Sequence, residues 1–585
     1  MPNSERFPTL HRVRKHAPRR ATRRSLFIAS TLFALASGTS ALAQSASQIT
    51  PDSFAPITRQ PSGAITVPQA MPSAAPEGAD SLFVTLGGLA IEGEQPEAEV
   101  VAALRSSLVG ERTSVADIFA QARWLETVYA DRGEVLTRVL VPAQDLARGA
   151  VLRLIIVRGE IEAVDTSAVP GAMAGKVDAL LSSLVGRPGV TIGEIERKLM
   201  LAADLPGLTL QTTLLPGDAP GSSVLAVEGD YRPIDGLVGI DNRLPDGLGR
   251  ESVSVGANFN GMLGWGETLY LRASGDPSTG FFGRDPRNRS LAAGVVLPVG
   301  NNGLSLNVEA TDARTGPDAA SGFPEIGTRF QRLATRITYP FLLDRSLRLS
   351  GTAVFDVTDE DIDIMAPIVL PVSRDRMRVV RLSGALAAYL PGNGQLTSSV
   401  ELAQGLNIFG ARTASDASAA LPLSRAGADA EFTALRWSGG IDQPLLSHLA
   451  FRLDASAQTT FGDAVVNSET FGLSSSDGVS PLAQGRLQGD DGFVSRLEVS
   501  TPFTFRSASA VMSPYGFAAA GWATRHQPTA AEQREIDAEG YGLGVRLAGN
   551  RPRPLGWSLG AELGWGTASG LPTTDRFSLT AQIRF

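Results

Sequence analysis

Apolar residues between positions 81 and 228 follow helical spacing and strand alternation in turn, and this order occurs twice. The first round has a strand at 82–84, amphipathic segments at 97–108 and 114–132, and β-rich runs at 135–141 and 151–157. The second round has a strand at 161–164, helical segments at 171–184 and 191–203, and strands at 208–215 and 222–228. Apolar positions three or four apart indicate one buried face of a helix, whereas alternation indicates a strand. The pattern predicts two tandem copies of a small α+β module, at residues 81–160 and 161–228.

Beyond residue 229 the helical spacing disappears, and apolar and polar residues alternate in segments of about 10 to 15 residues separated by turn residues. In one segment Trp557 and Trp565 fall on the same face, eight residues apart, which is about 26 Å at about 3.3 Å per residue. Outer-membrane barrels have an apolar band of about 25 Å between aromatic girdles. The region 229–585, which holds about 16 such segments and ends on Phe585, is therefore predicted to be a transmembrane β-barrel of about 16 antiparallel strands. A soluble sandwich or propeller is the alternative.

Residues 1–43 have the three parts of a cleaved secretory signal. Eight basic residues and one acidic residue accompany an uncharged apolar run from Ser25 to Ala36, and small residues follow at Ala41 and Ala43. A run of about 12 residues is too short to cross a bilayer as a helix. We therefore expect a signal peptide over 1–43, cleaved between Ala43 and Gln44. The next segment, 44–80, contains six prolines, and we expect it to be an extended linker.

The composition excludes several classes of protein. The chain of 585 residues has no cysteine, so a disulfide scaffold and a thiolate metal site are excluded. Of 52 basic and 60 acidic residues, eight and one belong to the signal, so the remaining chain has 44 basic and 59 acidic residues and a net charge near −15. This negative charge disfavours nucleic acid as a partner. His448 and His526, the histidines beyond the signal, lie far apart, and the sequence has no P-loop. We expect no enzymatic activity, no metal and no cofactor.

The order of signal, linker, two α+β modules and barrel resembles the outer-membrane transporters of two-partner secretion, a branch of the Omp85 superfamily. Similarity to the family's first POTRA (polypeptide-transport-associated) domain is carried by residues 129–133, Arg138, 141–144, Gly149 and 157–159. Similarity to the second POTRA domain is carried by residues 196–199, 204–207, 215–217 and 221–222. Residues 241–243, Asp-Asn-Arg, are similar to the start of the family's first barrel strand. The resemblance covers nearly the whole chain after the signal.

The expected loop between the eleventh and twelfth barrel strands, about 461–491, corresponds to loop 6 of the family. The family has Val-Arg-Gly-aromatic at the tip of this loop, ten residues before a Gly-Asp pair. The pair and the family residues that follow it are present here as Gly489, Asp490, Gly492, Glu498 and Pro502. Counting back ten residues places the tip at Val479, Ser480, Pro481 and Leu482. Ser480 therefore stands where the family has its arginine.

In the family that arginine pairs with an aspartate of the barrel wall, in the motif Phe-x-Asp-x-Gly. The matching residues here are Phe517, Ala519 and Gly521, so alanine stands at the aspartate position. Both members of the pair are absent together, and this is consistent because one of them alone in a partly dry lumen would cost several kcal/mol. We expect loop 6 to enter the lumen and to be held by weaker contacts, with Arg486 or Asp490 as candidates.

The family often has a lumen-plugging helix before its linker, but only residues 44–50 are free of helix breakers here. We therefore do not expect a long plug, and loop 6 is expected to be the main obstruction. Charged residues expected to face the lumen are candidates for tuning what passes, namely Arg332, Arg336, Arg452 and Asp454.

The resemblance implies a passive pore in the outer membrane of a Gram-negative bacterium, with the POTRA domains in the periplasm. Its client would be an unfolded, secreted exoprotein that adds a strand to an exposed POTRA edge. The candidate edges are 135–141 and 208–215, with contact candidates Val135, Arg138, Val141, Gln144, Leu208 and Leu210. Other expected partners are outer-membrane lipid, the barrel-assembly machinery and periplasmic chaperones. The alternatives are an insertase for other outer-membrane proteins and a non-secreting channel.

Overall fold

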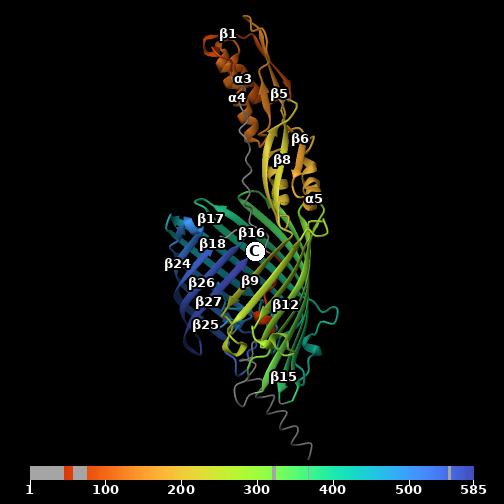
Figure 1. Ribbon diagram of the computed structural model, residues 1–585, viewed down its shortest axis with the longest axis vertical. Helices are drawn as coiled ribbons and strands as arrows, with labels where there is room; N and C mark the ends of the chain where they lie inside the picture. Colours follow the sequence, from red (N-terminus) through yellow and green to blue (C-terminus); the bar gives the residue numbers. More distant parts are fainter. Residues whose placement is uncertain are drawn as a thin grey trace, which may run out of the picture.

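The computed structural model describes residues 45–56, 75–219, 221–318, 324–366, 368–485, 487–550 and 555–585. Two α+β modules form a narrow arm that projects from one end of a wide barrel (Figure 1). We call this end of the barrel the module end and the opposite end the distal end. The expected signal cleavage site, Ala43 and Gln44, lies outside the described residues.

The first module has two helices on one side of a small mixed sheet. Its elements are β1 (Phe83–Thr85), β2 (Gly88–Gly93), α3 (Ala98–Leu108), β3 (Arg112–Ser114), α4 (Val115–Asp131), β4 (Arg138–Leu140) and β5 (Val151–Val157). The sheet order is β2-β5-β4, and β1 pairs separately with β3. The sequence pattern missed β2, which has only six residues and begins directly after Gly87. The helices and sheet enclose a core that includes Leu104, Leu125 and Leu154.

The second module repeats this plan with longer strands. Its elements are β6 (Glu160–Ala168), α5 (Gly171–Leu181), α6 (Ile192–Ala203), β7 (Leu208–Pro216) and β8 (Ser222–Tyr231), and the sheet order is β6-β8-β7. Helix α6 begins with a capping box in which Thr191 and Glu194 satisfy each other's backbone N–H groups. The core of this module extends to Leu343 at the module end of the barrel.

Polar contacts also join the second module to the barrel turns. Lys198 Nζ donates to the carbonyl of Asn301 at 3.0 Å, and Arg348 pairs with Asp204 at 2.6 Å. Gly303 lies so close to the module that a Cβ on it would be 2.6 Å from Leu201. The second module is therefore fixed against the barrel rim by both apolar and charged contacts.

The barrel is a closed antiparallel sheet in which β27 pairs with β9. Its strands are β9 (Ile234–Asp241), β10 (Ser252–Asn260), β11 (Thr268–Gly275), β12 (Asn288–Val299), β13 (Leu304–Thr315), β14 (Glu325–Leu343), β15 (Leu347–Ala366), β16 (Leu370–Leu390), β17 (Gly394–Gly405), β18 (Thr433–Leu446), β19 (Leu449–Thr459), β22 (Asp491–Ser500), β23 (Phe503–Phe505), β24 (Ala510–Thr524), β25 (Glu535–Gly549), β26 (Gly556–Ala568) and β27 (Leu571–Arg584). Because β22 and β23 both pair with β24, they share one position, and the described residues form a barrel of 16 strands as predicted.

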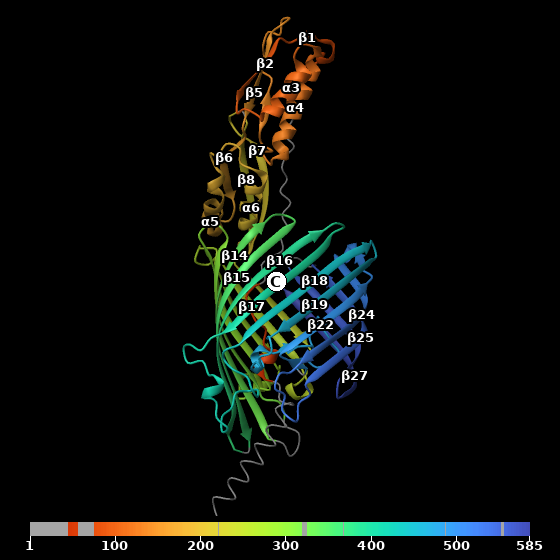
Figure 2. The ribbon, with the colours of Figure 1, turned by 180° about the vertical axis from the view of Figure 1, so that it is seen from behind.

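Side chains alternate between the lumen and the outside along each strand. On β14, Leu333 and Ile337 are about half exposed on the outer face, whereas Phe330 and Ala334 are buried on the inner face. Strands β14, β15 and β16 have 19, 20 and 21 residues, longer than the expected 10 to 15, and they extend beyond the other strands at the distal end (Figure 2). None of the described helices is both long and apolar enough to cross a lipid bilayer.

Candidate functional site in the barrel lumen

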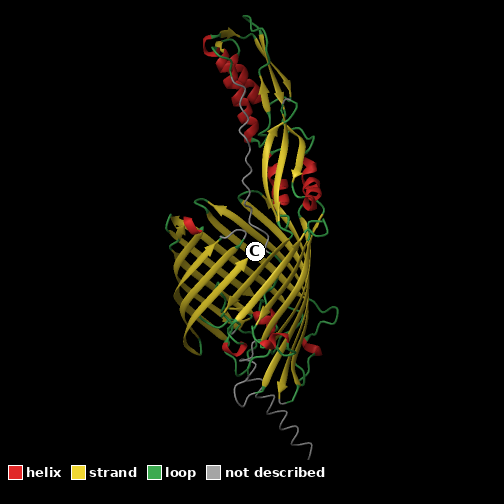
Figure 3. Ribbon diagram, in the orientation of Figure 1, coloured by secondary structure: helices red, strands yellow, loops and turns green. Residues whose placement is uncertain are grey.

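The segment between β19 and β22, which we call loop 6, folds back into the barrel. Loops and short helical turns lie between the barrel walls in its distal half (Figure 3). Loop 6 is held in shape by a small hairpin in which β20 (Phe471–Gly472) pairs with β21 (Gln488–Gly489). The position of this loop between the eleventh and twelfth strands agrees with the sequence-based assignment.

The tip of loop 6 packs against a patch of the wall that is lined by glycine. Val479 and Leu482 are buried against Ala519, Ala538 and Ala568. A Cβ added to Gly564 would be 2.6 Å from Pro481, and one added to Gly540 would be 2.9 Å from Val479. The missing side chains on β25 and β26 therefore make the space in which the tip sits.

Arg496, a residue of wall strand β22, contacts the tip of loop 6. Arg496 Nη1 donates to Ser480 Oγ at 2.6 Å, and its Nη2 donates to Glu562 at 2.6 Å. Ser480 Oγ also donates to the other oxygen of Glu562 at 2.5 Å, which closes a three-residue ring. The guanidinium of Arg496 lies 3.7 Å from the centre of the Phe517 ring, a cation–π arrangement.

Three further residues complete this cluster and satisfy its charges. Arg496 Nε donates to Glu498 at 2.8 Å, and Arg546 donates to both oxygens of Glu498 at 2.7 Å. Tyr515 donates to Glu562 at 2.8 Å. Arg496, Glu498 and Glu562 are each less than a tenth exposed. Two arginines, of which Arg546 remains partly exposed, thus balance two glutamates, so no charge in the network is unpaired.

This network refines one expectation from the sequence. Ser480 and Ala519 do replace the family's arginine and aspartate, but charge is present at the same point of the lumen. Arg496 is the direct cross-strand partner of Ala519 in the β22–β24 pair. The arginine is therefore carried by the wall instead of the loop, and its acid is Glu562 on β26. Apart from its apolar packing, the tip itself is held by the hydrogen bonds of Ser480 with these two wall residues.

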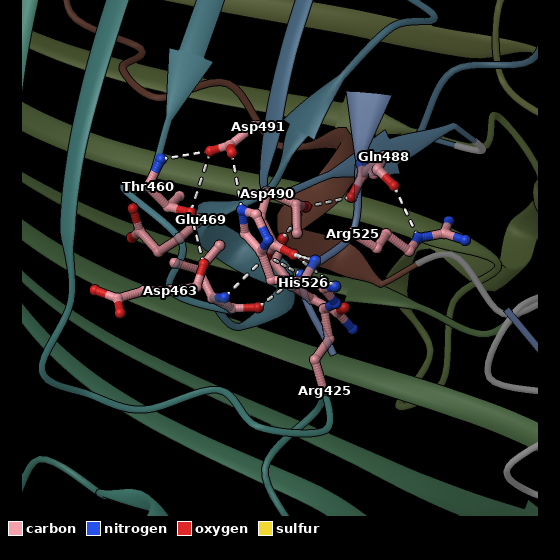
Figure 4. A network of polar contacts seen from close by, with 12 residues as sticks. Arg425, Thr460, Asp463, Glu469, Gln488, Asp490, Asp491, Arg525 and His526 are labelled. Carbon is pink, nitrogen blue, oxygen red and sulfur yellow. Dashed lines mark hydrogen bonds and ion pairs between the residues drawn. The ribbon is translucent and has the colours of Figure 1, made fainter. Parts of the chain in front are cut away.

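The base of loop 6 is anchored through Asp490, one of the two residues expected to hold the loop (Figure 4). Its carboxylate is fully buried and forms a two-point pair with Arg425, a residue of the long distal loop between β17 and β18. It also accepts backbone N–H bonds from Val465 at 2.9 Å and His526 at 2.7 Å. Arg486, the other candidate, lies outside the described residues.

A third anchor of loop 6 was not anticipated from the sequence. Glu469, which is 1% exposed, pairs with Arg381 on β16 at 2.7 Å and with Arg436 on β18 at 2.8 Å. Asp356 and Glu401 complete the ionic network around these two arginines. Loop 6 is therefore attached to the walls at its tip, its middle and its base.

The N-terminal segment 45–56 also lies in the lumen, which corrects its assignment as extended linker. It contains one helical turn, α2 (Ala46–Ile49), within the stretch that is free of helix breakers. Ala46 N–H donates to Thr328 at 2.8 Å, and Ser47 donates to Glu360 at 3.0 Å. Gln48 donates to Gln488 of loop 6 at 2.7 Å. Two segments, instead of loop 6 alone, thus fill the lumen.

Three charged wall residues fix the rest of this segment. Arg332 and Arg336 donate to the carbonyls of Pro51 and Asp52, at 2.9 and 2.7 Å. Both also pair with the fully buried Glu309, which accepts the N–H of Phe54 at 2.8 Å. These two arginines face the lumen as expected, and they bind a segment of the chain itself.

Open space remains on both sides of loop 6. A cavity of about 1630 Å³ at the distal side is lined by Ile326, Ile362, Leu482 and Leu487 among other residues. A cavity of about 500 Å³ at the module side is lined by Ser399, Ser438, Ser456 and Asp454. Asp454 is paired there with Arg452 at 2.7 Å. The wall toward the modules thus presents mainly small side chains, including several hydroxyl groups, whereas the distal wall presents both apolar and charged ones.

The glycines of the two sequence motifs lie where neighbouring parts of the chain pass close to their backbone. A Cβ on Gly489 or Gly521 would come within 2.8 Å of backbone oxygen, and one on Gly492 would be 2.5 Å from Phe471. These glycines allow close approach of neighbouring chains. Among the described residues, no group of three or more histidine, aspartate or glutamate side chains is placed to hold a metal ion.

The two candidate edge strands of the modules differ in how open they are. Strand β4 has three residues instead of the seven expected, and the N–H of Val139 is bound by Glu126 of α4 at 2.9 Å. Gln144 forms two bonds with the backbone of Arg153 on β5, at 2.8 and 2.9 Å. Arg138 turns its guanidinium to the carbonyls of Val135 and Thr137. Val141 packs on the module core. The first module therefore offers little free edge.

Strand β7 is the more open edge, with nine residues that pair only with β8 in the described structure. Leu208 and Leu210 pack on the module core. On the opposite edge of this sheet, β6 contains two register shifts, and Gly186 N–H donates to the carbonyl of Ile161. Hydrogen bonds from Ser222 and Asp218 hold the pKa of Glu162 on β6 below its usual range. A bulged, charged edge resists strand addition, which leaves β7 as the candidate.

Comparison with known proteins shows which family and which solved structures resemble this chain. Residues 221–547 match the family model of the haemolysin secretion/activation protein ShlB/FhaC/HecB, and residues 89–159 match the ShlB-type POTRA domain. Among solved structures, CdiB from Escherichia coli is similar with a TM-score of 0.68 and 16% identity, over 96% of this chain and 97% of that one. CdiB from Acinetobacter baumannii is similar with a TM-score of 0.59 and 16% identity, over 96% and 97% of the two chains.

A curated relative, the heme/hemopexin transporter protein HuxB of Haemophilus influenzae, is 22% identical over 174 residues. That match covers 29% of this chain and spans 30% of the length of the relative. The fold and these matches define an outer-membrane β-barrel with a periplasmic POTRA domain. The chain belongs to the ShlB/FhaC/HecB family of secretion/activation proteins. The module end is therefore periplasmic, and the distal end is extracellular.

Proposed function

We propose that this protein is the translocation pore of a two-partner secretion system and exports an unfolded exoprotein. The family match over residues 221–547 supports the class of activity. The observation that carries the proposal is the open edge of β7 in the second POTRA domain, next to the periplasmic entrance of a barrel whose lumen is closed by contacts that can be broken. The barrel-assembly machinery and periplasmic chaperones are proposed partners in its own insertion.

The hydrogen bonds that flank β7 define which backbone groups are free. Arg232 N–H donates to the carbonyl of Gly207 at 2.8 Å, and Gly217 N–H donates to Ser222 at 3.0 Å. Backbone groups of alternate residues point the same way in an antiparallel pair, so the odd-numbered residues of β7 face β8. The N–H groups of Leu210, Thr212 and Leu214 therefore point to the open edge. An extended client can pair with them through its own backbone, regardless of its side chains.

The lumen offers a path from this edge to the cell surface once loop 6 and residues 45–56 move. The cavity on the periplasmic side of loop 6 is lined by small hydroxyl residues, which present no large apolar surface to a passing chain. The larger extracellular cavity is lined by apolar residues such as Ile326 and Ile362 together with charged ones such as Arg525 and Arg576. Folding of the client outside would supply direction, because the periplasm has no ATP.

Proline substitution on β7 tests this function. Thr212→Pro removes one outward N–H and leaves the β7–β8 pairs in place, and proline is tolerated on an edge strand. Thr212→Val changes the same side chain and keeps the N–H, so it is the matched control. Each variant is introduced into a host strain that lacks the protein, and the secreted proteins are compared by mass spectrometry.

We expect deletion to remove one large exoprotein from the medium, and Thr212→Val to restore it. Thr212→Pro should restore about two- to tenfold less, which corresponds to one lost hydrogen bond, at an equal amount of barrel in the outer membrane. Equal secretion by the two variants would exclude capture at β7. Broad loss of barrel proteins on deletion would instead indicate an insertase, and an unchanged set of secreted and barrel proteins would indicate a non-secreting channel.

A further inference from the structure

The outer face of β12 to β16 carries a cluster of arginines at its extracellular end. We call it the arginine arc, and it consists of Arg289, Arg314, Arg329, Arg374, Arg376 and Arg378 with Asp312, Asp359 and Asp361. On β14 the odd-numbered residues face outward, because Leu333 and Ile337 are exposed while Phe330 and Ala334 are buried. Arg329 belongs to this outward set. The pairing register then assigns the other members of the arc to the same outer face.

The arc occupies successive rows of the sheet. One row runs Arg314, Arg329, Asp361 and Arg374 across four strands, and the next runs Asp312, Gln331, Asp359 and Arg376. The row after that contains the outward-facing Leu333 and Val357, and on β16 it continues to Arg378. The outward residues therefore change from apolar to charged at Arg378 on β16, at Asp359 on β15, at Asp312 on β13 and at Arg289 on β12.

The rows of the arc lie at the outer edge of the apolar band. Arg329 lies ten residues from Tyr339, an outward-facing aromatic near the periplasmic end of β14. Ten residues span about 33 Å along a strand, or about 25 Å across a membrane at a tilt of about 40°. The row with Gln331, Asp359 and Arg376 lies two residues closer to Tyr339, about 20 Å from it across the membrane, so the arc spans the outer edge of an apolar band of about 25 Å. The arginines lie at the depth of the outer-leaflet headgroups.

The carboxylates in the arc do not neutralise it. Asp312 is shared by three arginines, at 3.2 Å from Arg314, 3.5 Å from Arg329 and 3.8 Å from Arg289. Asp359 and Asp361 serve the three arginines of β16. Six guanidinium groups against three carboxylates leave an excess of three positive charges, and Asp363 lies one row farther from the membrane. The side chains of Arg329 and Arg374 are 49% and 42% exposed.

The opposite side of the barrel has the reverse charge at this end. Strand β25 presents the exposed carboxylates of Glu535, Asp537 and Glu539 next to a stacked pair of aromatic rings, Tyr541 and Trp565. A basic rim is therefore a property of one arc and not of the whole circumference. A ligand for the arc must be anionic, must lie in the headgroup layer and must suit forked donors.

Phosphate groups meet these requirements, since guanidinium binds them with paired N–H donors. We propose that the arginine arc binds the phosphate groups of a phosphorylated glycolipid in the outer leaflet. A bound glycolipid would fix the orientation of β12 to β16 in the membrane. The same strands hold residues 45–56 through Thr328, Glu360 and Glu309 on their inner face, so lipid outside and plug inside share one section of wall.

Native mass spectrometry of the full-length protein in detergent tests this site, with bisphosphorylated lipid A as the probe. The triple variant Arg314→Gln, Arg329→Gln and Arg374→Gln removes two exposed arginines of the arc and one that is partly exposed. Arg105→Gln, on exposed helix α3 of the first POTRA domain, is the matched control. Since each arginine near an anionic surface contributes about fivefold, the triple variant should bind on the order of a hundredfold more weakly, and the control should be unchanged.

Phosphate dependence is measured on the unmodified protein, so it does not depend on how the variant folds. We expect lipid A without its phosphates to bind at least about tenfold more weakly. Equal binding of both lipids, or equal binding by the triple variant and the control, would overturn the proposal. Inorganic phosphate at millimolar concentration should not displace the lipid. Complete displacement would overturn the assignment to glycolipid and indicate a site for free anions.

Discussion

Arg496 and Ala519 face each other directly across strands β22 and β24, and the guanidinium of this wall residue reaches the tip of loop 6 at Ser480. The resemblance in sequence predicts an arginine on the loop, at the position of Ser480. Here the loop contributes a neutral hydroxyl, while both charged partners belong to the wall. Withdrawal of the loop therefore breaks two hydrogen bonds and leaves the Arg496–Glu562 and Arg496–Glu498 pairs intact. The lumen can open without exposing an unpaired charge.

Moving the arginine from the wall to the loop tests this arrangement. Ser480→Arg alone would place a second guanidinium beside Arg496, and we expect it to weaken the closed state. Adding Arg496→Ser should restore closure, because Glu562 then pairs with the loop instead of the wall. Open probability of the purified protein in planar bilayers is the measurement. We expect a coupling free energy of about 0.5–3 kcal/mol between the two positions, and additive effects would contradict direct contact.

A larger side chain at a glycine of the wall patch should displace the tip of loop 6 that rests on it. A Cβ at Gly564 would be 2.6 Å from Pro481, whereas nothing lies within 4 Å of one at Gly556, on the same face of the same strand. Gly564→Val should therefore unseat the tip, and Gly556→Val is the control. The chain has no cysteine, so a single Ala483→Cys reports the exposure of the loop by its rate of maleimide labelling. Equal rates in the two backgrounds would show that the tip does not rest on this patch.

Replacing Arg425 alone should lower the stability of the folded barrel more than replacing both Arg425 and its partner Asp490. Arg425→Gln leaves the fully buried Asp490 without its ionic partner, and such a loss costs about 3–5 kcal/mol. In Arg425→Gln with Asp490→Asn the uncompensated charge is gone, so stability should partly recover. The temperature at which the folded barrel loses its fast migration in gels measures this. A double variant as unstable as the worse single one would contradict the argument.

Locking the N-terminal segment should block transport. Ala46 N lies 2.8 Å from Thr328 Oγ1, so Ala46→Cys and Thr328→Cys place two thiols close together in a chain that has no other, and a short crosslinker with an internal disulfide should join them. Secretion should fall to background when the crosslink is formed and return on reduction. Each single cysteine variant should secrete normally under both conditions. Normal secretion with the crosslink intact would mean that residues 45–56 remain in the lumen during transport.

The barrel could be predicted from sequence because each wall residue faces either lipid or lumen, which imposes alternation on segments such as that from Trp557 to Trp565. The tip of loop 6 could be located by counting from the Gly489-Asp490 pair. The role of Arg496 could not be predicted, since it depends on the register of β22 against β24. The contact of Ser47 with Glu360 joins residues 313 positions apart, and a proline-rich sequence contains no sign of where its ends dock.

The lumen is closed by two separate segments that are fixed to different sections of wall and meet only at the Gln48–Gln488 bond among the contacts described above. This arrangement has a consequence for leakage. If each segment were displaced independently about 1% of the time, a typical population for a minor state, both would be displaced together about 0.01% of the time. Small molecules would then rarely find an open path through the resting protein. A client that displaces both segments at once could keep the cell envelope nearly sealed before and after its own passage.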